Sequence, residues 1–134
     1  MRIDGGCHCA FITYQGEADP EKVGVCHCTD CQALIGTAFR VAVPVDGATF
    51  KMSGQPTIYV KAADSGNKRE QAFCPRCGSP IYATSPGPGP KTYSIRAGTI
   101  RQRQELPPKL QIWTHSKLRW VDQLASVPSA DSKR

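Results

Sequence analysis

The stretch Cys26-His27-Cys28-Thr29-Asp30-Cys31 places three thiols within six residues. In an extended strand the side chains of residues i and i+2 lie on one face, so Cys26 and Cys28 can converge while His27 points to the other face. Three convergent thiolates suit zinc, a tetrahedral ion that accepts sulfur ligands, and leave its fourth position open. The stretch therefore predicts a metal site with a free coordination position.

A short helix is expected directly after Cys28. Thr29 or Asp30 can cap its start, Gln32-Ala33-Leu34-Ile35 continues it, and Gly36 suits its C-terminal end. Cys31 then lies in the first turn, where unpaired backbone N–H groups and the helix dipole favour a thiolate. The helix would bring the third sulfur next to the other two.

The other four cysteines form two pairs. Cys7-His8-Cys9 repeats the Cys-X-Cys spacing, and Cys74-Pro75-Arg76-Cys77-Gly78 has the spacing of a metal knuckle, with the proline setting its turn. The seven cysteines divide most economically into a closed structural zinc site and an open, catalytic zinc site. The closed site would use Cys7, Cys9, Cys74 and Cys77, and the open site Cys26, Cys28 and Cys31.

Other uses of these residues remain open at this point. Disulfides could use six of the thiols, although cysteines two residues apart rarely meet disulfide geometry. His8 and His27 could themselves be ligands, but strand alternation turns both away from the sulfurs and favours a supporting or solvent-facing role. A different pairing would join the second Cys-X-Cys pair to the knuckle, with an open set of Cys7, Cys9 and Cys31.

Length and composition bound the class of protein. A chain of 134 residues suggests one zinc-binding domain, residues 1–125, and a disordered C-terminal tail, residues 126–134. The N-terminus lacks an apolar signal segment, and no run approaches the roughly 18 apolar residues of a membrane span. We therefore expect no membrane partner and a cytoplasmic protein, in which thiols stay reduced.

The formal charge of +6 does not point to nucleic acid. Binding two Zn²⁺ through seven thiolates would lower this charge by three, to about +3. Lysine and arginine are also scattered along the chain rather than clustered. No nucleic-acid partner is expected.

The rest of the sequence predicts a mainly β fold with one short helix. A final segment, 109–124, contains Trp113 and Trp120, for which a place in the core is the favoured role. A meander is expected in the middle of the chain. Residues that favour strands, separated by turn signals, predict strands at 7–14, 37–45, 48–52, 57–61, 68–73, 80–84 and 92–97.

Several motifs occur in a fixed order. They are Gly6-Cys7-His8-Cys9, then Cys26 to Cys31 followed by Gly36-Thr37-Ala38-Phe39, then Phe73 to Tyr82, and finally Gln111-Ile112-Trp113. This ordered set resembles the glutathione-dependent formaldehyde-activating family, which also includes centromere protein V, and the resemblance covers roughly residues 5–124.

The resemblance implies a β-tent fold of short antiparallel strands with one zinc ion on each cysteine set. It also implies a carbon–sulfur lyase that joins glutathione to formaldehyde, giving S-hydroxymethylglutathione. Glutathione would then be the small-molecule partner, and a homodimer is a reasonable default. Candidates for pairing with its carboxylates are Lys68, Arg69, Arg76, Arg96 and Lys117.

The chain departs from the family pattern at four places. Ala10 stands where glycine is frequent, Gln32 where arginine is common, and Gln111 where histidine often precedes Ile-Trp. Arg101-Gln102-Arg103 replaces a turn that is usually acidic. None of these departures removes a metal ligand.

Two other classes of function stay open. A non-catalytic zinc-binding module for protein or nucleic-acid partners would hold both metals without thiol-dependent activity. A redox or zinc-responsive switch would lose one zinc when Cys26, Cys28 and Cys31 are oxidised.

Overall fold

The computed structural model describes residues 1–63 and 65–131. Short 3-10 helices occur at Pro20–Lys22, Ala97–Thr99, Arg103–Glu105, Thr114–Ser116 and Val121–Ser126. The strands are β1 (Arg2–Gly6), β2 (Thr13–Glu17), β3 (Gly24–Cys26), β4 (Arg40–Asp46), β5 (Lys51–Ser53), β6 (Thr57–Ala62), β7 (Lys68–Phe73), β8 (Pro80–Thr84), β9 (Thr92–Arg96) and β10 (Leu110–Ile112), and the α-helix is α1 (Thr29–Ile35).

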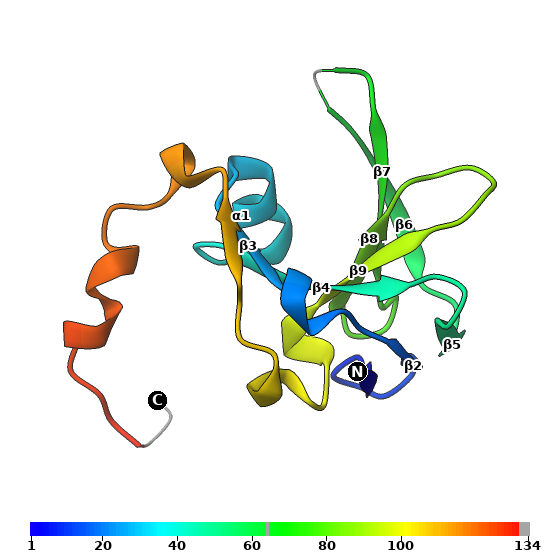
Figure 1. Ribbon diagram of the computed structural model, residues 1–134, viewed down its shortest axis with the longest axis horizontal. Helices are drawn as coiled ribbons and strands as arrows, with labels where there is room; N and C mark the ends of the chain where they lie inside the picture. Colours follow the sequence, from blue (N-terminus) through cyan, green and yellow to red (C-terminus); the bar gives the residue numbers. More distant parts are fainter. Residues whose placement is uncertain (64, 132–134) are drawn as a thin grey trace.

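The strands form two sheets (Figure 1). A three-stranded sheet has the order β1-β2-β5, and a seven-stranded sheet has the order β10-β3-β4-β9-β8-β7-β6. Neighbouring strands are antiparallel except β10 and β3, which pair in parallel. The prediction of a mainly β fold with one short helix is confirmed.

One hydrophobic core joins the two sheets. Ile3 and Tyr14 from the small sheet pack in the same cluster as Val43 and Ile95, which lie opposite each other on β4 and β9. Ile3, Val43 and Ile95 are at most 1% exposed. Strand alternation leaves the other face of the large sheet free for α1 and its cysteines.

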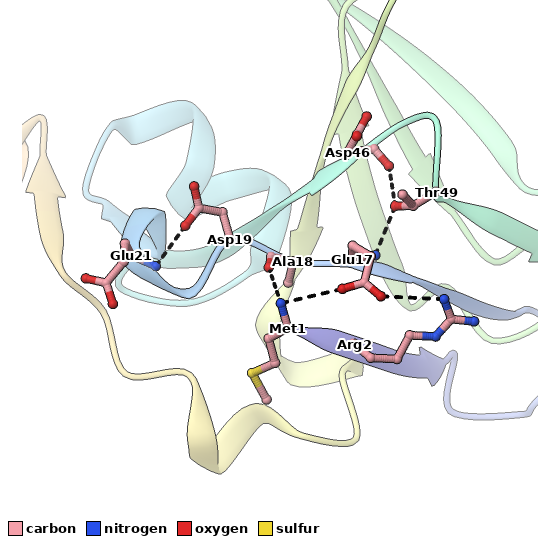
Figure 2. Close-up of polar contacts among 8 residues, drawn as sticks. All are labelled: Met1, Arg2, Glu17, Ala18, Asp19, Glu21, Asp46 and Thr49. Carbon is pink, nitrogen blue, oxygen red and sulfur yellow. Dashed lines mark hydrogen bonds and ion pairs between the residues drawn. The ribbon is translucent and has the colours of Figure 1, made fainter.

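Polar contacts fasten the N-terminus to this core (Figure 2). The Met1 ammonium donates to the Ala18 carbonyl oxygen at 2.9 Å and lies 3.5 Å from the Glu17 carboxylate. The Glu17 backbone N–H donates to the Thr49 hydroxyl, which in turn donates to the Asp46 carbonyl oxygen. These bonds hold β1 and β2 against the turn after β4.

The predicted strand at 7–14 is wrong. The chain leaves β1 after Gly6, turns, and enters β2 only at Thr13. The Cys7 N–H donates to the Ile12 carbonyl at 3.0 Å and the Ala10 N–H donates to the Cys7 carbonyl at 3.1 Å, which closes a compact loop. The expected meander holds from β6 to β9, but β5 pairs with β2 instead of joining it.

The predicted core position of the two tryptophans is also wrong. Trp113 is 57% exposed and Trp120 is 52% exposed, because the chain beyond β10 runs along the outside of the molecule (Figure 1). Part of the predicted tail, residues 132–134, lies outside the described residues. No helix among the described residues is long and apolar enough to cross a membrane.

Candidate functional site

The first cysteine cluster joins the two sheets. The Sγ atoms of Cys7, Cys9, Cys74 and Cys77 all lie within 4.8 Å of one another. Cys9 Sγ is 3.7 Å from both Cys7 Sγ and Cys74 Sγ. Zn–S bonds of about 2.3 Å in a tetrahedron require sulfurs about 3.8 Å apart, so the four sulfurs fit a closed zinc site.

Backbone turns aim these sulfurs inward. At the knuckle, Gly78 has a φ of +78° and donates its N–H to the Cys74 carbonyl, which closes the turn. The Ile12 N–H donates to Cys7 Sγ, and the Arg76 N–H donates to Cys74 Sγ. Backbone N–H groups that donate to sulfur stabilise thiolates, as they do around the ligands of metal sites.

The second cluster comes from one short stretch. The sulfurs of Cys26, Cys28 and Cys31 also lie within 4.8 Å of one another. Cys26 ends β3, Cys28 is the N-cap of α1 and accepts the Cys31 N–H at 3.3 Å, and Gly36 ends the helix with a φ of +73°. The cap is therefore Cys28, whereas the sequence favoured Thr29 or Asp30.

This cluster consists of three thiols. Among the described residues, no additional His, Cys, Asp or Glu joins the set. All seven cysteines are free thiols, so the disulfide alternative is wrong. The alternative open set of Cys7, Cys9 and Cys31 is wrong as well, because Cys31 lies with Cys26 and Cys28.

Neither neighbouring histidine joins a cluster. His27 is completely buried, and its Nε2 lies 2.7 Å from Gln111 Oε1 while its ring packs on Phe39. Its backbone N–H donates to the Ile112 carbonyl, which ties the cysteine stretch to β10. His8 is exposed. His27 therefore has the supporting role expected from strand alternation.

A cavity adjoins the open cluster. It has a volume of about 570 Å³ and is lined by Cys28, Asp30, Lys61, Trp113 and His115, among others. Trp113 has a φ of +56°, a left-handed conformation that costs a non-glycine residue about 1–2 kcal/mol. Strain of this kind concentrates at functional sites. The cavity gives a small molecule access to the face of the cluster formed by Cys28.

Comparison with known proteins indicates which family the chain belongs to. A family model described as glutathione-dependent formaldehyde-activating enzyme matches residues 2–116. The chain belongs to this family. The chain is similar in fold to a Rhodobacter sphaeroides protein, a structural genomics target whose crystal structure is known. The TM-score is 0.60 and the sequence identity is 16%. The likeness covers 81% of this chain and 98% of that one. No curated protein matches.

Two departures from the pattern of the formaldehyde-activating family support the open cluster. Gln111 holds His27, as described above, and Gln32 Nε2 donates to the carbonyls of His27 at 2.9 Å and Ser116 at 3.1 Å. Gln32 therefore connects α1 to the segment that carries Trp113. Both substitutions keep the cysteine stretch attached to the C-terminal wall of the cavity.

A third departure, Ala10, leads to a stability prediction. Ala10 has a φ of +66°, a left-handed conformation that glycine adopts without strain. Ala10→Gly removes a strain of about 1–2 kcal/mol but adds about 0.4–1 kcal/mol of unfolded-chain entropy. We expect the melting temperature to rise by about 2–4 °C. Ala48→Gly is the control, because Ala48 has no positive φ, and it should not raise the melting temperature. A lower melting temperature for Ala10→Gly would contradict the presence of backbone strain at Ala10.

Positive charges gather on the sheet face next to the open cluster. The strand register places Arg40 opposite Cys26, Arg96 opposite Ala42, and Arg69 opposite Lys61, with all four basic side chains on one face. We call Arg40, Lys61, Arg69 and Arg96 the basic face.

Lys61 pairs with Asp30 at 3.0 Å, whereas no carboxylate among the described residues pairs with the three arginines. Burial and the neighbouring Arg40 lower the pKa of Arg69, and the same causes lower the pKa of Arg96 to about 10. The three arginines therefore carry positive charge that no carboxylate among the described residues offsets, beside the thiols of Cys26 and Cys31.

The five basic residues that the sequence suggested for pairing with carboxylates of glutathione do not lie together in the structure. Arg69 and Arg96 belong to the basic face. Lys117 pairs with Asp122, Arg76 lies 3.9 Å over the ring of Phe11, and Lys68 is exposed. Sequence reasoning missed Arg40, since only the pairing of β3 with β4 brings it beside Cys26.

Proposed function

We propose that this protein is a zinc-dependent carbon–sulfur lyase of the S-(hydroxymethyl)glutathione synthase type. One observation carries the proposal: three cysteine sulfurs form a set that could hold a metal ion and that no other side chain among the described residues completes, and Cys28 lines a cavity. A volume of about 570 Å³ suits a small molecule. Family membership supports glutathione as the thiol.

Each cysteine set has its own part in this proposal. Cys7, Cys9, Cys74 and Cys77 hold a structural zinc, and Cys26, Cys28 and Cys31 hold the catalytic one. When bound by three thiolates, zinc is a weak Lewis acid whose open position suits a thiolate sulfur better than water. We place the protein in the cytoplasm, where reducing conditions keep these thiols available for metal.

The reaction forms one bond and moves one proton. The glutathione sulfur adds to the aldehyde carbon, the C–S bond forms, and the carbonyl oxygen takes up the proton that the thiol gives up. The reverse reaction breaks this bond and releases the aldehyde. His115 lines the cavity together with Cys28, and we assign it the proton transfer. Asp30 is paired with Lys61, and His27 is buried against Gln111.

Arg69, on the basic face, supplies charge for a carboxylate of glutathione, and a matched pair of variants tests this. Arg69 and Lys68 are neighbours on β7, but only Arg69 lies on the basic face. A hydrogen bond to a charged group contributes about 1.5–3 kcal/mol, so Arg69→Gln should raise KM for glutathione about tenfold or more. Lys68→Gln should leave KM unchanged. Equal KM values for Arg69→Gln and Lys68→Gln would show that Arg69 does not bind glutathione.

The proposed activity is tested by the rate of adduct formation. Glutathione and formaldehyde combine without a catalyst, so exchange NMR should compare their interconversion with and without the zinc-loaded protein. We expect the zinc-loaded protein to accelerate the interconversion in proportion to its concentration. The double variant His115→Gln plus Cys31→Ser should abolish this acceleration. An interconversion rate equal to the uncatalysed rate would reject this activity.

A further inference from the structure

A second cavity lies between α1 and the large sheet. Its volume is about 360 Å³, and its wall is formed by Leu34 and Ile35 from α1 with Tyr59, Phe73 and Arg96 from the strands, among others. It has no lining residue in common with the cavity at Cys28. Most of its wall is apolar, so an apolar body of a ligand would be favoured there.

The polar feature of this cavity is one buried guanidinium. Arg96 is 6% exposed, and its Nη2 donates to Gln71 Oε1 at 2.7 Å. Gln71 also lines the cavity and fixes the orientation of the guanidinium. Arg96 Nη1 is buried and has no hydrogen-bond partner among the described residues. A buried guanidinium with one nitrogen left without a hydrogen bond is costly, and an anionic ligand beside it would offset part of that cost.

Neighbouring arginines favour an anion in the same place. Arg40 and Arg69 lie close enough to Arg96 to lower its pKa, whereas the thiols of Cys31 and Cys26 act in the opposite direction. No carboxylate among the described residues forms an ion pair with Arg96. The apolar wall offers few other donors, so a phosphate dianion would lose more hydration than it could recover.

We propose that this cavity binds a small organic carboxylate with an apolar body, whose carboxylate pairs with the guanidinium of Arg96. The apolar body packs against Leu34, Tyr59 and Phe73. Neither zinc nor glutathione enters this inference, so it does not depend on the proposed function.

A titration followed by ¹H–¹⁵N NMR tests this site in the zinc-loaded protein. The probes are benzoate and 3-phenylpropionate, and benzamide and 3-phenylpropanamide are their uncharged counterparts. Saturable shifts of the Leu34, Ile35 and Gly78 amides with the acids, at least tenfold tighter than with the amides, are expected. Equal binding of acids and amides, or no saturable shift with the acids, would overturn the proposal.

Variants locate the charge that binds the probe. Arg96→Met should weaken benzoate binding at least tenfold. Leu34→Glu, at a residue 37% exposed at the mouth, should weaken it by repulsion without altering the core. Val60→Glu is the matched control, since Val60 is 49% exposed on β6 and does not line the cavity. Equal effects of the Leu34 and Val60 variants would also overturn the proposal.

A further variant separates this site from the proposed lyase activity. Cys31→Ser should lose glutathione binding but keep benzoate binding, because Cys31 does not line the Arg96 cavity. Loss of benzoate binding in a folded Cys31→Ser protein would count against an independent carboxylate site.

Discussion

Cys74→Ser is expected to unfold the protein. Cys74 is 1% exposed and connects the end of β7 to the loop after β1, so its cluster joins the two sheets. A structural zinc contributes about 10–16 kcal/mol to folding at neutral pH, whereas a whole domain is stable by about 5–15 kcal/mol. Loss of one ligand should therefore abolish the cooperative thermal transition, as measured by circular dichroism.

A matched variant distinguishes this effect from the loss of any cysteine. Cys28→Ser removes a ligand of the open cluster, which lies within one short stretch and joins no two sheets, so its transition should persist. A Cys74→Ser protein that melts cooperatively at the wild-type temperature would contradict the structural role of the closed cluster.

Cys31→Ser is expected to abolish turnover while the fold remains. Cys31 is half-buried in the first turn of α1, and the core cluster does not include it. Removal of residues that merely support a metal ligand costs about 10–100-fold in metal affinity or activity, so loss of a ligand should cost at least about a hundredfold. Exchange NMR of the glutathione–formaldehyde adduct measures the rate, and circular dichroism measures the fold.

Ala33→Ser is the control for this substitution. It introduces the same hydroxyl two residues further along α1 and leaves the cysteines intact. Its rate should equal that of the wild-type protein. A Cys31→Ser rate within a few-fold of wild type would mean that the third sulfur is not needed for the reaction.

Local sequence patterns predicted much of the fold. The expected strands at 68–73 and 80–84 agree with β7 and β8, because alternating residues and the flanking turn signals act within each segment. The strand expected at 7–14 failed for a different reason. Backbone bonds around Cys7 close a loop that strand propensity does not encode. The pairing of β5 with β2 depends on long-range packing, so the local sequence pattern did not predict it either.

The cysteine sets followed from spacing, but their surroundings did not. Three sulfurs in one stretch, and two pairs left over, were enough to predict both clusters. The buried Nη1 of Arg96, which has no partner among the described residues, depends on strands far apart in the sequence. Trp113 lines a cavity only because β10 lies at the edge of the sheet. Such features arise from topology, which a single sequence does not reveal.

The central claim is that the cluster of Cys26, Cys28 and Cys31 holds a metal ion that accepts a thiol as its fourth ligand. Visible absorption of the Co²⁺-substituted protein, titrated with glutathione, tests it most directly, because the spectrum depends on the ligand set and geometry. The account predicts a change that saturates at about one glutathione per chain and is absent with S-methylglutathione. A spectrum that saturating glutathione leaves unchanged would contradict the account.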